Sequence, residues 1–187
     1  MILPLVLLLF IFCHIFIQTF WTLTSRGYNY KDFIKTWKSL RSVPIVVIEG
    51  IGFFQILLFP LFRLPTIYLP SYPIQIFGLT ISLLGVILAS WAKKIMGASW
   101  GRPAQHDKDK QNKLVVAGPF RFTRNPIYIG LFLLFTGQQI ALGSYGILIS
   151  IIFATIIRNS AIIEEKLLEH YFGKEYIAYK SRVSRFI

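Results

Sequence analysis

Residues 118–130 read GPFRFTRNPIYIG, in which two arginines and a proline stand directly before a long apolar run. Asn125 is a residue type that favours the N-cap of a helix, and Pro126 suits the first helical position. The stretch therefore predicts a helix that begins at Pro126 and enters a membrane within about one turn. The free N–H groups at such a helix start, with Arg121 and Arg124 beside them, can hold an anion. The more general explanation of such arginines is that they only orient a membrane helix.

Composition places the chain among integral membrane proteins. Of its 187 residues, 55% are hydrophobic, 16% aromatic and only 15% charged, which is too apolar for an ordinary soluble domain. The net charge of +12 comes from basic residues between the apolar runs, as expected for loops that face anionic lipid. This pattern argues against nucleic acid as a partner. The single cysteine, Cys13, lies in the first apolar run, so an intramolecular disulfide is impossible and a packing role is expected.

The apolar runs predict an all-α, polytopic membrane protein with one membrane-embedded domain over residues 1–187. The expected spans are 2–23, 44–62, 74–92, 126–142 and 145–163. Pro60 should kink or end the second span. In the third span, Gly78, Ser82 and Gly85 are small enough to allow close helix contact.

The last two spans are separated by only Gly143 and Ser144, so they are expected to form an antiparallel hairpin. After the fifth span the helix should continue into water as EEKLLEHYF, with Gly173 as its C-terminal cap. A short helix should follow that carries Tyr176, Tyr179 and Val183 on one face.

Basic residues predict the orientation of these spans. All but one of the 20 lysines and arginines, the exception being Arg63, fall in the first and third connections or from Arg158 onward. Such an excess marks cytoplasmic segments. We therefore expect the N-terminus outside, the C-terminus in the cytoplasm, and any chemistry at the cytoplasmic face.

Two charges are expected inside the membrane. Glu49 lies about one and a half turns within the second span, and Arg158 lies more than a turn within the fifth. An unpaired buried charge is costly, so we expect Glu49 to pair with Arg158 or another inward arginine. A direct ligand role for Glu49 is an equally open alternative. His14, beside Cys13 in the first span, is expected to be a packed and hydrogen-bonded core residue.

The two adjacent acids that follow are expected to differ in role. Glu165 lies seven residues after Arg158 and nearly on the same helix face, whereas Glu164 shares a face with Ser160. No phosphate-cradling loop, dinucleotide-binding glycine pattern or two-histidine metal spacing is present in the sequence, so no metal is expected.

Two motifs together resemble the isoprenylcysteine carboxyl methyltransferase family of membrane-embedded enzymes that use S-adenosylmethionine. They are LVVAGPFRFTRNPIYIG at residues 114–130 and EEKLLEHYFGKEYIAYKSRV at 164–183, and the resemblance covers about residues 105–183. It implies a cofactor-binding and catalytic region at 105–187, after a three-span region at 1–104. It also implies a cytosolic cofactor pocket closed by the C-terminal tail, and a lipophilic substrate that enters between the membrane helices.

The resemblance implies S-adenosylmethionine as the cofactor, a lipophilic or prenylated substrate, and membrane lipid as surroundings; no obligate protein partner is evident. Glu164 is the expected contact to the methionyl end, since a carboxylate in a partly dry pocket favours a cation. We expect Arg158 to orient the acceptor, and an amine or thiol acceptor to lose its proton either to water or to Glu165. The other residues implied to contact the cofactor are Gln105, Asn112, Lys113, Leu114, Val115, Gly118, Phe120, Arg124, Asn125, Pro126 and Tyr128.

Two departures from the family pattern bear on the substrate. The usual Arg-His-Pro is Arg124-Asn125-Pro126 here, and Ser160 stands where the eukaryotic enzymes have a substrate-binding arginine. The expected reaction is carboxyl O-methylation of a prenylcysteine-like substrate. The alternatives are methylation of a lipid amine or thiol, an NADPH-dependent membrane reductase of the sterol type, and a non-catalytic membrane module.

Overall fold

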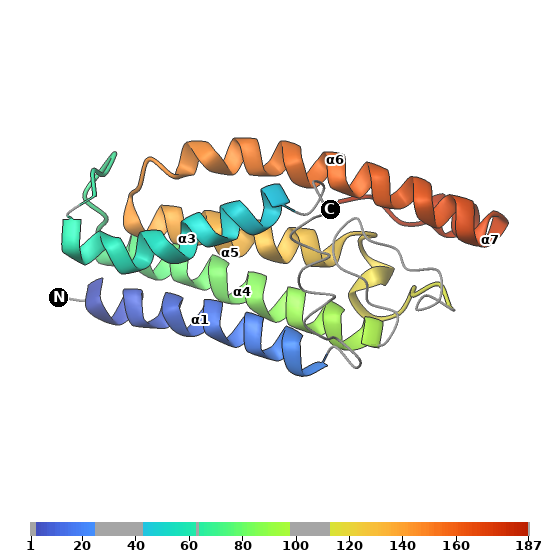
Figure 1. Ribbon diagram of the computed structural model, residues 1–187, viewed down its shortest axis with the longest axis horizontal. Coiled ribbons are helices and arrows are strands. Elements are labelled where there is room, and N and C mark those ends of the chain that lie inside the picture. Colours follow the sequence, from blue (N-terminus) through green and yellow to red (C-terminus); the bar gives the residue numbers. More distant parts are fainter. Residues whose placement is uncertain (1–2, 25–42, 63, 98–112, 187) are drawn as a thin grey trace.

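The computed structural model describes residues 3–24, 43–62, 64–97 and 113–186, and these form a bundle of helices (Figure 1). Gln105 and Asn112 lie outside the described residues. The six α-helices of the described parts are α1 (Leu3–Thr24), α3 (Val43–Phe62), α4 (Tyr72–Met96), α5 (Pro126–Leu142), α6 (Ile147–Phe172) and α7 (Lys174–Lys180). A 3-10 turn, η2 (Gly118–Arg121), precedes α5. The all-α prediction is confirmed.

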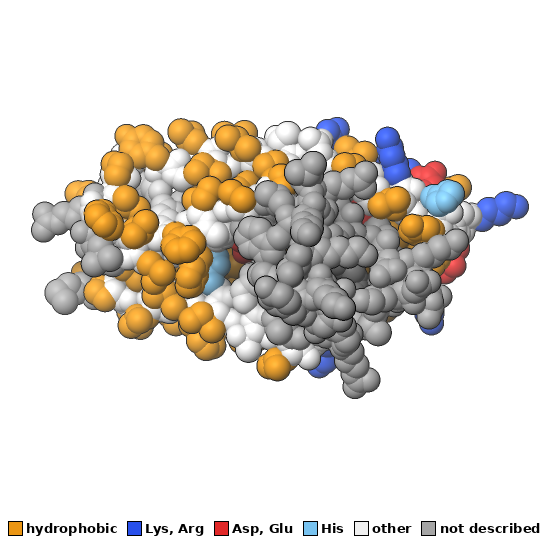
Figure 2. Space-filling view, viewed as in Figure 1, with side chains coloured by type: hydrophobic (Ala, Val, Ile, Leu, Met, Phe, Trp, Pro, Cys, Tyr) orange, Lys and Arg blue, Asp and Glu red, His pale blue; other side chains and the backbone are white. Residues whose placement is uncertain are grey.

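Within the described residues, three helical segments are long and apolar enough to cross a membrane: Pro4–Trp21 within α1, the whole of α4, and the whole of α6. Two shorter apolar helices, Val47–Phe59 within α3 and Pro126–Leu142, accompany them. On the face shown in Figure 2, hydrophobic side chains gather over the end of the bundle where the N-terminus lies, and charged side chains gather around α7. This division suits a protein that is embedded at one end and meets water at the other.

The third span is longer than the sequence indicates. We expected it to end at Ala92, but α4 continues to Met96, and Lys93 has 0% of its surface exposed. Lysine is a good helix former and is favoured in the last turn, where it meets the negative end of the helix dipole. Its charge therefore did not mark the end of the helix.

α4 and α5 touch through paired glycines. A Cβ atom added at Gly85 would lie 2.5 Å from the carbonyl oxygen of Gly130, and one added at Gly78 would collide with the carbonyl oxygen of Gly137. Between these pairs, the hydroxyl of Ser82 donates a hydrogen bond to the carbonyl oxygen of Leu134 at 2.9 Å. The predicted close contact in the third span is confirmed, and it brings the start of α5 beside the end of α4.

A buried polar network joins α1, α3 and α5 within the bundle. His14 Nε2 lies 3.0 Å from Gln138 Oε1, and the Gln138 amide donates to the carbonyl oxygen of Gly52 at 2.8 Å. Gln139 donates to Gln55 at 2.9 Å. His14 is thus a hydrogen-bonded core residue as predicted, and Cys13 is buried beside it. Satisfying these groups within the bundle avoids the cost of leaving them unpaired in an apolar environment.

The expected pairing of Glu49 with Arg158 is wrong. Glu49 is buried, and neither of its carboxylate oxygens has a hydrogen-bond partner among the described residues. Arg158 is exposed on the outside of α6. Glu49 lies on the buried face of α3, together with Ile45 and Gly52, whereas Arg158 lies on the exposed face of α6.

The predicted hairpin is present, and so is a short helix after Gly173, although α7 ends at Lys180 and does not include Val183 as expected. Gly143, with a left-handed φ of +60°, ends α5 and donates to the carbonyl oxygens of Gln139 and Ile140, so α6 can return antiparallel to α5. α6 continues to Phe172, and the N–H of Gly173 caps it through the carbonyl oxygen of Glu169. After α7 the chain turns back along α6 toward the bundle (Figure 1). The C-terminal residues therefore reach the start of α5.

Candidate active site

A pocket opens at the charged end of the bundle. It lies where the end of α4, the start of α5, the second half of α6 and α7 meet, and it encloses about 690 Å³ including its open mouth. The lining residues are Met96, Leu114, Val115, Phe120, Arg124, Asn125, Pro126, Ile127, Tyr128, Glu164, Glu165, Leu168, Tyr176 and Tyr179.

Asn125 begins α5 but does not cap it with its side chain, which corrects one expectation from the sequence. Pro126 is the first residue of the helix, as predicted, and Asn125 occupies the N-cap position without a side-chain capping bond. Its amide instead donates to Glu165 Oε1 and to the carbonyl oxygen of Arg185, each at 3.2 Å. The side chain therefore ties the helix start to α6 and to the C-terminal residues.

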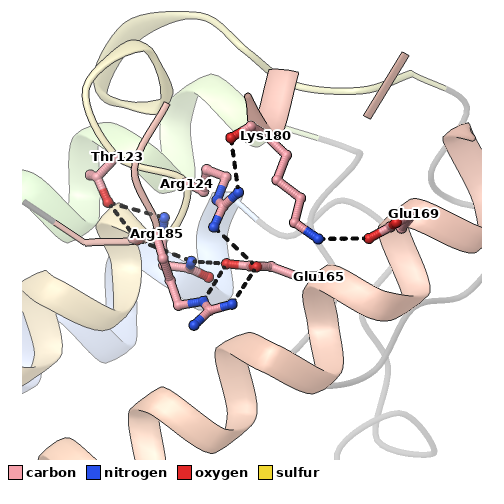
Figure 3. A network of polar contacts seen from close by, with 7 residues as sticks. Thr123, Arg124, Glu165, Glu169, Lys180 and Arg185 are labelled. Atoms are coloured by element: carbon pink, nitrogen blue, oxygen red, sulfur yellow. Dashed lines mark hydrogen bonds and ion pairs between the residues drawn. The ribbon is translucent and has the colours of Figure 1, made fainter. Parts of the chain in front are cut away.

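Glu165 is the centre of a buried ion-pair network (Figure 3). Arg185 donates to both of its oxygens, from Nε at 2.9 Å and from Nη2 at 3.0 Å, and these bonds raise the pKa of Arg185. Arg124 Nη2 lies 3.2 Å from Glu165 Oε2. The Glu165 side chain is only 4% exposed, and its negative charge is compensated by the two arginines.

The last described residues form a strap, residues 183–186, that crosses the start of α5. The N–H of Arg124 donates to the carbonyl oxygen of Ser184 at 2.9 Å, and the Thr123 hydroxyl donates to that of Arg185 at 2.9 Å. Phe186 packs against the main apolar core of the bundle. The strap is thus fixed at backbone, side-chain and apolar contacts beside the pocket.

Glu164 has different contacts from its neighbour. Its Oε2 accepts a hydrogen bond from the Tyr128 hydroxyl at 2.9 Å, and both residues line the pocket. About 100° separates consecutive side chains on a helix, so the two acids face different neighbours, as their spacing predicted. Glu164 supplies negative charge to the pocket, while Glu165 holds arginines at its edge.

Two tyrosines of α7 complete the pocket wall. The Tyr179 hydroxyl donates to the carbonyl oxygen of Phe120 at 2.7 Å, and burial raises the pKa of Tyr179 to about 12. Tyr176 is fully buried and packs with Leu114 and Tyr179 in one apolar cluster. Burial is also the main cause of the raised pKa of Tyr176, and the nearby Glu165 adds to it. Both hydroxyls therefore keep their protons in the physiological range.

The comparisons with known proteins agree with this arrangement. A model of the phospholipid methyltransferase (PEMT) family matches residues 74–175, which is more than half of the chain. The chain belongs to this family. The family match includes α4, the start of α5 and both acids of α6, so the residues around the pocket fall mostly within it.

Curated relatives of this family member are protein-S-isoprenylcysteine O-methyltransferases. The human protein is 29% identical over 128 residues, covering 65% of this chain and 45% of that relative. An Arabidopsis thaliana protein, form B, is 31% identical over 111 residues, covering 57% of this chain and 55% of the relative. The Saccharomyces cerevisiae protein is 28% identical over 128 residues, covering 67% and 54%. The chain thus spans about half the length of the curated relatives that it matches.

Most of the residues that the sequence predicted for the cofactor lie together in the pocket of this family member. Leu114, Val115, Phe120, Arg124, Asn125, Pro126, Tyr128 and Glu164 line it, as does Glu165. Lys113 is exposed and does not line it. Gly118 lies behind the wall, where its φ of +60° is left-handed and an added Cβ atom would lie 2.9 Å from the Ile95 side chain. Both features favour glycine at this position.

Arg158 is not brought into the pocket. It lies on the exposed side of α6, whereas Ser160 is buried. Arg158 and Glu165 are seven residues apart and were expected on nearly the same face of α6. Their surroundings differ because Asn125 at the start of α5 and Arg185 of the strap cover Glu165, whereas Arg158 is exposed. The role of Arg158 toward the acceptor stays a prediction.

Sequence reasoning missed Arg185 and the pocket role of Met96, Leu168, Tyr176 and Tyr179. The shared face of Tyr176 and Tyr179 was a usable signal for a buried surface on α7, but it did not say what the face covers. Arg185 stands in a basic segment that reads as an exposed tail. Only the fold brings it to an acid twenty residues earlier in the chain.

Proposed function

We propose that this protein transfers a methyl group from S-adenosylmethionine to an acceptor carried by a lipophilic, membrane-embedded molecule. The observation that carries this proposal is the pocket itself. The pocket is lined both by Arg124, Asn125 and Pro126 at the start of α5 and by the two acids of α6, Glu164 and Glu165. Most of it lies within the region that matches a methyltransferase family. The curated relatives of the chain are named as O-methyltransferases of protein S-isoprenylcysteine. Carboxyl O-methylation of a prenylcysteine-like acceptor is therefore the proposed reaction.

The residues of the pocket fit the cofactor chemically. Glu164 provides a carboxylate for a cationic group, and Arg124 provides buried N–H donors for an anionic one. Leu114, Met96 and Leu168 form apolar walls against which a nucleoside can pack. When bound, S-adenosylmethionine supplies a methyl group that is activated by its positively charged sulfur.

The demands on the protein are alignment and exclusion of water. Methyl transfer from a sulfonium is an in-line displacement, and a desolvated, well-aligned nucleophile accelerates it. A carboxylate acceptor is already ionised and needs no general base. Both oxygens of Glu165 are engaged by arginines, which favours a holding role over proton transfer for this residue.

The membrane arrangement follows from the same proposal. We place α1, α3, α4, α5 and α6 across the bilayer, with the N-terminus outside and the pocket and C-terminus at the cytoplasmic face. α5 has 17 residues, which at about 1.5 Å per residue is near the lower limit for a span. The concentration of basic residues at the pocket end supports this orientation.

A second acceptor, a lipid amine, is favoured by two observations. The matching family model is that of phospholipid methyltransferases, and neither Arg158, which is exposed, nor Ser160, which is buried, lines the pocket. A carboxylate acceptor would therefore need a cationic partner other than residue 160, which is an arginine in the eukaryotic enzymes and Ser160 here.

Ligand binding and product analysis test the proposal. In detergent, S-adenosylhomocysteine should raise the melting temperature of the protein, and NADPH should not. With labelled S-adenosylmethionine, a farnesylated N-acetylcysteine should yield a base-labile methyl ester, whereas phosphatidylethanolamine would yield a base-stable N-methyl product. Stabilisation by NADPH alone, or by neither ligand, would refute the methyltransferase proposal, and the product distinguishes the two acceptors.

A further inference from the structure

Two buried hydrogen-bond donors of the pocket have no partner among the described residues. Tyr176 has 0% of its surface exposed, and its hydroxyl has no hydrogen-bond partner among the residues that the structure describes. The Arg124 side chain is 8% exposed; Nη1 donates to the carbonyl oxygen of Lys180 and Nη2 pairs with Glu165. Its buried Nε has no partner within the same described parts of the chain.

An orphan donor at this depth is unusual. Most buried polar side-chain atoms in folded proteins have a partner, and leaving one unpaired is costly. Both donors line the same pocket, and the neighbouring polar groups are satisfied: Tyr179 donates to Phe120, and Tyr128 donates to Glu164. The unsatisfied positions are therefore confined to one corner, between α7 and the start of α5.

The character of the corner is that of an anion site. Burial raises the pKa of the Tyr176 hydroxyl and the nearby Glu165 adds to this, while Arg124 is close enough to act in the opposite direction. The hydroxyl therefore keeps its proton and remains a donor. One neutral O–H and one guanidinium N–H, on two residues that line the same pocket, suit a carboxylate, which accepts several hydrogen bonds.

We propose that the Tyr176 hydroxyl and Arg124 Nε together bind the methionyl carboxylate of the cofactor. Glu164, in the same pocket, then meets the ammonium of the same amino acid group. A donor pair beside an acid is complementary to a zwitterion, which the cofactor carries. This inference rests on the proposed function, since it assigns residues to the cofactor of that function. The other source of a carboxylate is the acceptor molecule.

Tyr176→Phe is the decisive variant, because it removes the hydroxyl and keeps the ring that packs against Leu114. Affinities for S-adenosylhomocysteine and for its decarboxylated analogue are measured by calorimetry in detergent. The variant should bind S-adenosylhomocysteine about tenfold or more weakly, as expected for a lost bond to a charged group. It should bind the decarboxylated analogue as the wild type does. Without ligand its melting temperature should be equal or higher, because an unsatisfied hydroxyl is gone.

Tyr179→Phe is the matched control, since its hydroxyl is already satisfied by Phe120. It should lower the melting temperature of the unliganded protein and change the affinities for both compounds by the same factor. Three results would overturn the inference while leaving the proposed function intact. They are unchanged affinity of Tyr176→Phe for S-adenosylhomocysteine, equal loss for both compounds, or an effect only on the KM of the acceptor. Failure of the wild type to bind S-adenosylhomocysteine would overturn both.

Discussion

Removing the positive charge of Arg185 should loosen the C-terminal strap without unfolding the bundle. Arg185 makes two charge-assisted hydrogen bonds to Glu165, at 2.9 and 3.0 Å, and such bonds contribute about 1.5–3 kcal/mol when buried. The Arg185 side chain is 31% exposed, so solvent screening reduces this value toward that of surface pairs. Glu165 keeps Arg124 and Asn125 as partners in the variant. We therefore expect Arg185→Gln to destabilise strap docking by about 1–2 kcal/mol.

Hydrogen exchange measures this change directly. The amide of Arg124 is bonded to Ser184, and that of Val183 to Tyr179, so both report on opening of the strap. A change of about 1–2 kcal/mol corresponds to roughly 5–30-fold faster exchange at these amides. Amides in the middle of α4 and α5 should exchange at the wild-type rate.

Arg182→Gln is the matched control. Arg182 is exposed and follows α7, and its Nε donates to the carbonyl oxygen of Ala178 in that helix. The control should change exchange by no more than about twofold, as is usual for surface substitutions. Equal exchange in the two variants would show that the Arg185–Glu165 pair does not hold the strap. High salt should reduce the difference between them, because the Arg185 end is partly exposed.

Four further substitutions test the bundle and the pocket. Gly85→Val should disrupt the contact with Gly130 and either prevent folding or lower stability by several kcal/mol. Gly50→Ala is its control and should be neutral or slightly stabilising, because a Cβ atom at Gly50 meets no atom within 4 Å. Melting temperatures in detergent compare the two variants. Glu49→Gln should keep the fold and raise stability slightly, because it removes a buried acid that has no partner among the described residues. A loss of acceptor binding with the fold intact would indicate a ligand role for Glu49. Arg158→Lys should leave S-adenosylhomocysteine affinity unchanged and lower turnover, and an unchanged rate would refute its role toward the acceptor.

Local signals predicted the parts of the fold that depend on neighbours in sequence. The Asn125–Pro126 step marked the start of α5, Gly143 marked the hairpin, and Gly173 marked the end of α6, because each acts within one turn of backbone. The end of α4 was misplaced because a lysine in a sequence reads as solvent-exposed. In the structure, packing buries Lys93 completely, and tertiary contacts outweigh that local signal.

The site was predicted as a set of residues more accurately than as a set of contacts. The two motifs located one wall on η2 and α5 and another on α6, and the fold brings these walls together as expected. Which side chains touch depends on geometry that motif spacing does not contain. Asn125 has the side chain of an N-cap, yet it bonds Glu165, forty residues away, because α6 and the strap approach it from outside the helix.

The contrast between the adjacent acids explains how the pocket can hold opposite charges close together. Glu165 pairs with Nη2 of Arg124 and with Nε and Nη2 of Arg185. The first contact holds the guanidinium of Arg124 in place, while its Nε has no partner among the described residues. Glu164 is bonded to Tyr128 on a different side of the helix. If Glu165 were not paired with arginines, the combined negative charge of the two acids would oppose a carboxylate there. With Glu165 neutralised by arginines, the pocket can present an acid at one end and donors at the other, and loosening Arg185 should therefore weaken carboxylate binding through Arg124.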